Sequence, residues 1–270
     1  MKKILEFLDH QMPKPEIYSS FSASWFQYLS LTIILLLSVL AVIKMRKMND
    51  KQINRILIIT SIILWVFEIY KQIIFSYGAN WDYQWYAFPF QFCSAFLYVA
   101  PIIPFLKPGK VRNALIVFLA TYSFFSGTAV IMFPSTVFIT TTGINIQTMV
   151  HHGVLMIVGM GLLANYKTRK ISDFFGSAIV FLVLLLIAVL LNTIHNNWIG
   201  DGTFNMFFIN PKYENGIPIL ELVQPLVGPI SFIIIYYLGF TMLAGIIFWI
   251  GTSITKKIPN HQREKFSYAK

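Results

Sequence analysis

The sequence predicts an all-α, polytopic membrane protein with seven transmembrane helices, its N-terminus outside and its C-terminus in the cytoplasm. Three observations lead to this fold class. Of the 270 residues, 56% are hydrophobic and only 12% are charged, whereas soluble domains carry roughly 25% charged residues. Apolar stretches long enough to cross a bilayer recur along the chain. Basic residues are alternately dense and sparse from one connection to the next.

The seven predicted spans each contain about 20 mostly apolar residues, the length that a helix needs to cross the hydrocarbon layer. Helices are expected rather than strands, because every backbone polar group inside a bilayer must find a partner within its own segment. In chain order the predicted spans cover residues 25–43, 56–77, 85–106, 111–133, 147–164, 174–192 and 226–250.

The connections between spans predict the orientation, because cytoplasmic loops carry an excess of Lys and Arg. The first connection holds five basic residues, the third and fifth hold three each, and the segment after residue 255 holds five. The opposite side holds only four. We therefore expect an outer amphipathic segment at 1–24, a transmembrane domain at 25–255 and a basic cytoplasmic tail at 256–270.

The remaining composition excludes several classes of protein. The net charge of +10 arises from loop clusters that set topology, so nucleic acid is not an expected partner. The single cysteine rules out an intramolecular disulfide. Lys2 and Lys3 precede an apolar run too short for a signal peptide, and this segment is expected to lie on the bilayer surface. Neither a metal nor a cofactor is expected.

Two long outer connections have an unusual composition. Residues 134–145 are uncharged and rich in threonine, whereas residues 193–225 place Trp198, Phe204, Phe207, Phe208 and Tyr213 among glycines and prolines. Aromatic side chains favour the membrane interface. These connections are therefore expected to dip into the outer interface, either as a lid or as plain interfacial packing.

Ionisable residues inside a span are costly and suggest a functional site. Glu68 and Lys71 lie three residues apart on the second predicted helix, so they share a face and can form an ion pair. A purely structural ion pair is the alternative interpretation. Together with Gln91, His152 and Asn205, these two residues form the predicted substrate-binding set.

A possible nucleophile and base occur in two other spans. Cys93 lies about eight residues into the third span and His151 about four into the fifth, and both spans enter from outside. A thiol becomes a useful nucleophile beside a base such as histidine, so a direct contact between the two side chains is expected. His152 points about 100° away from His151 on the same helix. Apolar filling by the cysteine and a structural role for the histidines are the alternatives.

The run Pro89-Phe90-Gln91-Phe92-Cys93, followed 58 residues later by His151, resembles the YwaF-like integral membrane proteins of bacteria. These are related to a eukaryotic transmembrane acyltransferase that remodels ether phospholipids. More distantly, they are similar to the androgen-induced transmembrane hydrolases of fatty acid esters. The resemblance implies that Cys93 is a nucleophile and His151 its base.

The sequence departs from this family at two points. Relatives often carry histidine two residues before the cysteine, where this chain has Gln91. Their late outer loop often has an Asn-Tyr pair, where here Asn205 is followed by Met206. These departures leave the Cys93 and His151 positions unchanged.

The sequence thus favours an enzyme in the cell membrane, a lipid acyltransferase or a related fatty-ester hydrolase. It would move a fatty acyl chain from a phospholipid to a lyso-lipid or another amphiphilic acceptor. The alternative is a non-enzymatic transporter or substrate-binding subunit with an outward-facing polar pocket. A retinal-binding pump is excluded, because the last span has no lysine near its middle.

Overall fold

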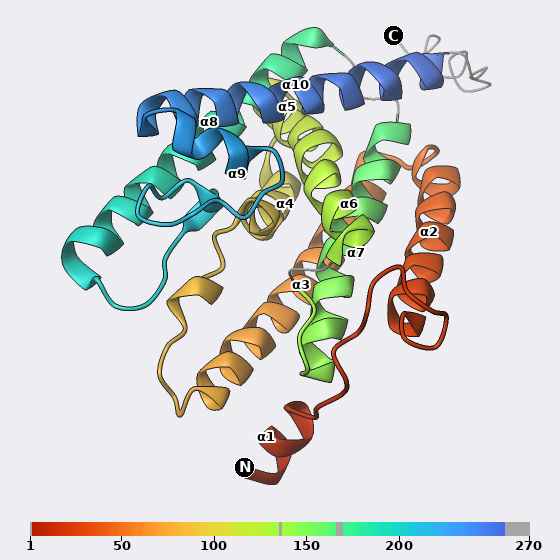
Figure 1. Ribbon diagram of the computed structural model, residues 1–270. Helices are drawn as coiled ribbons and strands as arrows, with labels where there is room; N and C mark the ends of the chain where they lie inside the picture. Colours follow the sequence, from red (N-terminus) through yellow and green to blue (C-terminus); the bar gives the residue numbers. More distant parts are fainter. Residues whose placement is uncertain (1, 135–136, 166–169, 257–270) are drawn as a thin grey trace, which may run out of the picture.

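The computed structural model describes residues 2–134, 137–165 and 170–256, and these residues fold into helices joined by loops (Figure 1). Within them, the only β-type pairing is an isolated bridge between Gln11 and Thr141. The predicted all-α membrane fold is therefore confirmed. Most of the predicted basic tail, residues 257–270, lies outside the described residues.

Ten α-helices are found in the described part of the chain. They are α1 (Lys2–Leu8), α2 (Trp25–Met45), α3 (Asp50–Gly78), α4 (Ala95–Ile102), α5 (Lys110–Phe118), α6 (Phe124–Met132), α7 (Thr142–Ala164), α8 (Ile171–Ile194), α9 (Leu220–Val223) and α10 (Pro229–Lys256). A π-helical turn, Leu119–Ser123, joins α5 to α6, and another, His195–Ile199, extends α8.

Six helices are long and apolar enough to cross a membrane. They cover Trp25–Met45, Asp50–Gly78, Lys110–Met132, Thr142–Ala164, Ile171–Ile199 and Pro229–Ile254. These correspond to six of the seven predicted spans. The outer surfaces of α2, α3 and α10 expose apolar side chains such as Leu36, Val66 and Ile230, which is typical of faces that contact lipid.

The third predicted span differs from the expectation of one continuous helix over 85–106. Its main helical part is short and apolar, covering Phe92–Phe105, and a separate 3-10 turn, Trp85–Ala87, precedes it across the non-helical residues 88–91. Proline explains the difference, because it lacks the N–H that a helix interior needs. Pro89 stands before the helical part, and Pro101 and Pro104 lie within it.

This segment nevertheless runs antiparallel to α3 over most of the length of that helix. Gln72 Nε2 donates to the carbonyl oxygen of Ala87 at 2.7 Å, and Trp65 Nε1 donates to that of Leu97 at 3.1 Å. Near the start of α3, Asn54 accepts a hydrogen bond from Arg112 at 2.8 Å. The chain thus passes from one end of α3 to the other. The count of seven crossings stays a prediction.

The connections gather at two ends of the molecule in the order that the sequence predicts. At one end, Met12 N donates to the carbonyl oxygen of Thr140, and Tyr70 Oη donates to that of Leu8, both at 2.7 Å. At the other end, Asn165 Nδ2 donates to the carbonyl oxygen of Met45 at 2.8 Å. The N-terminal segment and the loop before α7 therefore share one end, as expected for segments on one side of a membrane.

Glycines bring α6 and α7 close together. A Cβ atom at Gly127 would lie 2.6 Å from Cβ of Leu155, and one at Gly159 would lie 2.5 Å from Cβ of Phe124. Both distances are shorter than any normal carbon–carbon contact, so only glycine permits this approach. The close packing fixes the position of α7, the helix that carries His151.

The orientation predicts the outcome of a reporter experiment. A reporter fused after residue 270 is expected to be cytoplasmic, and one inserted at Gly200, in the outer connection, is expected to be outside. Alkaline phosphatase and a fluorescent protein, each active on one side only, make the measurement. Finding both fusion sites on one side would overturn the seven-helix topology.

Candidate functional site

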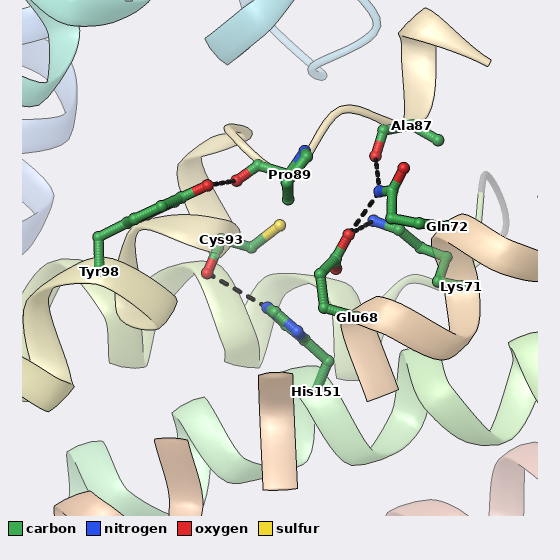
Figure 2. Close-up of polar contacts among 8 residues, drawn as sticks. All are labelled: Glu68, Lys71, Gln72, Ala87, Pro89, Cys93, Tyr98 and His151. Atoms are coloured by element: carbon green, nitrogen blue, oxygen red, sulfur yellow. Dashed lines mark hydrogen bonds and ion pairs between the residues drawn. The ribbon is translucent and has the colours of Figure 1, made fainter. Parts of the chain in front are cut away.

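A cluster of polar side chains lies between α3, α7 and the segment that leads into α4 (Figure 2). Glu68 and Lys71 come from α3, His151 comes from α7, and Cys93 lies in the 3-10 turn Phe92–Ser94. Glu68 and His151 are buried, with exposed fractions of 1% and 3%. The structure therefore brings together four of the residues that the sequence selects.

The predicted ion pair between Glu68 and Lys71 is confirmed. Glu68 Oε1 lies 2.9 Å from Lys71 Nζ and also accepts a hydrogen bond from Gln72 Nε2 at 2.6 Å. The same Gln72 nitrogen donates to the carbonyl oxygen of Ala87 at 2.7 Å. Gln72 is not among the site residues predicted from the sequence. Its position four residues after Glu68 on the same helix could have indicated this hydrogen bond.

Glu68 keeps one oxygen without a partner. Its Oε2 atom is buried and forms no hydrogen bond with any described residue. A buried carboxylate oxygen without a donor is destabilising, so this atom is available to a donor from a bound molecule. Lys71 is more accessible, with 17% of its side chain exposed.

The contact between Cys93 and His151 differs from the expected direct contact of thiol and imidazole. His151 Nε2 lies 3.3 Å from the backbone carbonyl oxygen of Cys93 (Figure 2). A carbonyl only accepts, so Nε2 carries the hydrogen in this contact. The distance is longer than the usual 2.9–3.0 Å for such a bond, so the interaction is weak. His151 Nδ1 is buried and finds no partner among the described residues.

The sulfur of Cys93 points away from His151 and to the side on which Glu68 lies (Figure 2). Both Glu68 and Lys71 lie within electrostatic range of it. The residue as a whole is only partly buried.

His152 lies apart from this contact, as the helical geometry predicts. Its Nδ1 atom donates a hydrogen bond to the carbonyl oxygen of Thr148, one turn earlier in α7, at 2.8 Å. Its ring packs beside that of His151, with centroids 5.1 Å apart. The bond to its own helix orients the ring independently of Cys93.

Gln91 and Asn205 hold the outer connection against the entry of α4. Gln91 Nε2 donates to the carbonyl oxygen of Asn205, and Gln91 Oε1 accepts from the backbone N–H of Phe207, both at 3.0 Å. Asn205 Oδ1 accepts from the backbone N–H of Asn210 at 2.9 Å. Both amides therefore fix the conformation of the connection. Phe207 needs such support, because its φ of 58° is unfavourable for a residue with a side chain.

A cavity of about 650 Å³ opens between the outer connection and the start of α10. Its lining combines charged, amide and aromatic side chains, including Lys212, Tyr213, Glu214, Glu221, Gln224 and Phe232. The sequence predicts that residues 193–225 lie at the membrane interface. In the structure, part of this connection forms one wall of the cavity. Among the described residues, no cluster of three or more His, Cys, Asp or Glu side chains could hold a metal ion.

The fold and this cluster together define a multi-pass α-helical membrane protein with a buried polar site between α3, α7 and the segment that leads into α4. Comparison with protein families gives a more specific result. A model of the TMEM164 family matches residues 19–252, and the chain belongs to that family. No curated protein and no solved structure matches the chain. The family match supports a transmembrane family, whereas the YwaF-like and acyltransferase resemblance stays a prediction.

Proposed function

We propose that the protein is an integral membrane lipid acyltransferase of the cell membrane, with Cys93 as nucleophile and His151 as base. The observation that carries the proposal is the meeting of these two residues, 58 positions apart, inside one polar cluster. Seven crossings with the N-terminus outside would place this cluster in the outer leaflet. There it is open to phospholipids of that leaflet.

A small movement would form the catalytic pair. The ring of His151 already touches the carbonyl group of Cys93 at 3.3 Å. A change of the Cys93 χ1 rotamer moves the sulfur relative to that carbonyl, and staggered rotamers interconvert at little cost. The weak carbonyl contact is then given up, the imidazole takes the tautomer with its hydrogen on Nδ1, and Nε2 accepts a hydrogen bond from the thiol. Such contacts commonly tighten only when substrate binds.

The reaction then proceeds in two acyl transfers. His151 removes the thiol proton, and the sulfur of Cys93 attacks the ester carbonyl carbon of a phospholipid. Collapse of the tetrahedral intermediate breaks the bond to the glycerol oxygen, which takes the proton from His151 and leaves as lyso-phospholipid. The hydroxyl group of a second amphiphile attacks the thioester, and the thiol of Cys93 is regenerated.

The ion pair of α3 is suited to a polar head group. A lipid ammonium can donate to Glu68 Oε2, the oxygen that has no partner among the described residues. A phosphate oxygen can bind Lys71, which is partly exposed. Gln91, His152 and Asn205 support this site through its surrounding structure, since each forms a hydrogen bond with a backbone group of the protein.

The acyl-enzyme intermediate offers a direct test. Purified protein in vesicles of phosphatidylcholine and phosphatidylethanolamine is quenched in acid, digested and analysed by mass spectrometry. We expect a fatty acyl adduct on Cys93 that hydroxylamine removes, since thioesters are cleaved by it. The matched control is His152→Ala, which should keep the adduct. An unmodified Cys93 under turnover with a lyso-lipid acceptor would favour the transporter instead.

A further inference from the structure

Tyr236, the eighth residue of α10, has a hydroxyl group with no hydrogen-bond partner among the described residues. The residue is completely buried, and its Oη atom forms no hydrogen bond with any described residue. Buried side-chain polar atoms in native proteins are nearly always paired, and exceptions require an explanation. A phenylalanine would fill the same space without burying an unpaired hydroxyl group.

Two other tyrosines in the same core show the ordinary arrangement. Tyr122 Oη donates to Thr241 Oγ1 at 3.1 Å, and Tyr237 Oη donates to the carbonyl oxygen of Ala178 at 3.3 Å. Tyr122 is as deeply buried as Tyr236. The missing partner is therefore particular to Tyr236 and is not a general property of tyrosines in this core.

The position of Tyr236 relates it to the nucleophile. Phe240 packs against Tyr236, with ring centroids 4.5 Å apart, and against Phe92, with centroids 4.9 Å apart. Phe92 directly precedes Cys93. Tyr236 and Cys93 lie within electrostatic range of each other, yet no hydrogen bond joins them among the described contacts. Two ring contacts, through Phe240 and Phe92, therefore connect Tyr236 to the residue next to the nucleophile.

The cavity between the outer connection and α10 also reaches the first turns of that helix. Phe232 lines the cavity of about 650 Å³, and Tyr236 follows one helical turn later on the same face. The two rings lie 6.3 Å apart between centroids. The lining of the cavity therefore comes within one helical turn of Tyr236.

We propose that Tyr236 is a further catalytic residue, whose hydroxyl group donates a hydrogen bond to the oxyanion formed when Cys93 attacks the ester. This inference rests on the proposed function. As the carbon–sulfur bond forms, the electron pair of the carbonyl π bond moves to oxygen, and that oxygen becomes the acceptor that Tyr236 lacks. Collapse returns the pair to the carbonyl group and expels the glycerol oxygen, which takes the proton held by His151. Tyr236 keeps its own proton throughout.

Two probes with different chemistry test this role. A p-nitrophenyl ester of a long-chain fatty acid acylates Cys93 through an oxyanion, whereas an N-alkyl iodoacetamide alkylates it by direct displacement, without one. In Tyr236→Phe, acylation is expected to be slower by about a hundredfold, the typical loss of one oxyanion donor. Alkylation is expected to stay within about threefold of wild type under the same principle, because no oxyanion forms.

Stability measurements separate catalysis from folding. Tyr236→Phe should unfold at the same or a higher temperature than wild type, because the removed hydroxyl has no partner. Tyr122→Phe, the matched control, should unfold at a lower temperature and keep its acylation rate. Equal acylation by Tyr236→Phe and wild type, or a parallel fall of acylation and alkylation, would overturn the role of Tyr236.

Failure of the proposed function gives a different result. If the wild-type protein reacts with the ester no faster than a simple thiol of similar exposure, Cys93 is not an activated nucleophile and the proposed function fails. A second result would contradict only the role of Tyr236. In that case the wild type is acylated rapidly and Cys93→Ala is inert, but Tyr236→Phe is as active as the wild type.

Discussion

Cys93→Ala is expected to lower acyl transfer by at least about a thousandfold, because removing a nucleophile removes the covalent route entirely. The measurement is transfer of a labelled fatty acid from phospholipid to lyso-phospholipid in vesicles that contain the purified protein. Cys93→Ser should also be far below wild type, since a hydroxyl group is a poor nucleophile without strong activation. Both variants should unfold within a few degrees of wild type, because Cys93 is only partly buried.

His151→Ala should also lose acyl transfer, because it removes the base that activates the thiol. Without its base, the thiol beside Glu68 stays protonated, and the rate should fall by roughly 10²–10⁴-fold. His152→Ala is the matched control, since its ring bonds the carbonyl oxygen of Thr148 and is oriented independently of Cys93. Equal losses in the two histidine variants would point to disturbed packing of α7. Full activity in Cys93→Ala would remove the covalent mechanism altogether.

The long spans could be predicted from the sequence because a bilayer imposes one simple requirement on each of them. In a run of about 20 apolar residues, the backbone N–H and C=O groups can all form hydrogen bonds within the segment only if it is a helix, whatever its neighbours are. The segment around residues 85–106 also satisfies the length requirement, yet it contains Pro89, Pro101 and Pro104. Tertiary contacts, such as that of Trp65 with the carbonyl oxygen of Leu97, stabilise its broken helix. Hydropathy does not contain that information.

The candidate site could be predicted only where its geometry is local. Glu68 and Lys71 are three residues apart on one helix, so helical spacing alone predicts their contact. The approach of Cys93 to His151 was predicted from similar depth in two spans, but depth does not determine which atoms meet. The structure places the carbonyl oxygen of Cys93, rather than its sulfur, against the ring.

Other parts of the site depend on contacts between distant segments. Gln91 holds the outer connection through Asn205 and Phe207, more than 100 positions away in the sequence. Tyr236 differs from Tyr237 in its complete burial and in having no partner among the described residues. One tyrosine beside another in an apolar helix gives no sequence signal for that difference.

The Glu68–Lys71 pair is expected to show strong coupling in a double-mutant cycle. Removing one partner of a buried ion pair costs on the order of 3–5 kcal/mol, because the other charge remains in a low-dielectric environment. Lys71→Met should cost more than Glu68→Gln, because Glu68 is the more deeply buried partner, with 2% of its side chain exposed against 17% for Lys71. Unfolding of the purified protein by sodium dodecyl sulfate in mixed micelles measures each free energy.

The double variant distinguishes a coupled pair from two independent side chains. Glu68→Gln with Lys71→Met leaves no unpaired charge, and Gln72 can still donate to the new amide oxygen at position 68, so the double variant should be more stable than Lys71→Met alone. Asp82→Asn with Lys14→Met, at two exposed positions, is the control and should show additive effects. A loss in the Glu68–Lys71 double variant equal to the sum of its single losses would mean that the 2.9 Å contact contributes no coupling. The charges would then act separately, and a zwitterionic head group would have no preformed pair to bind.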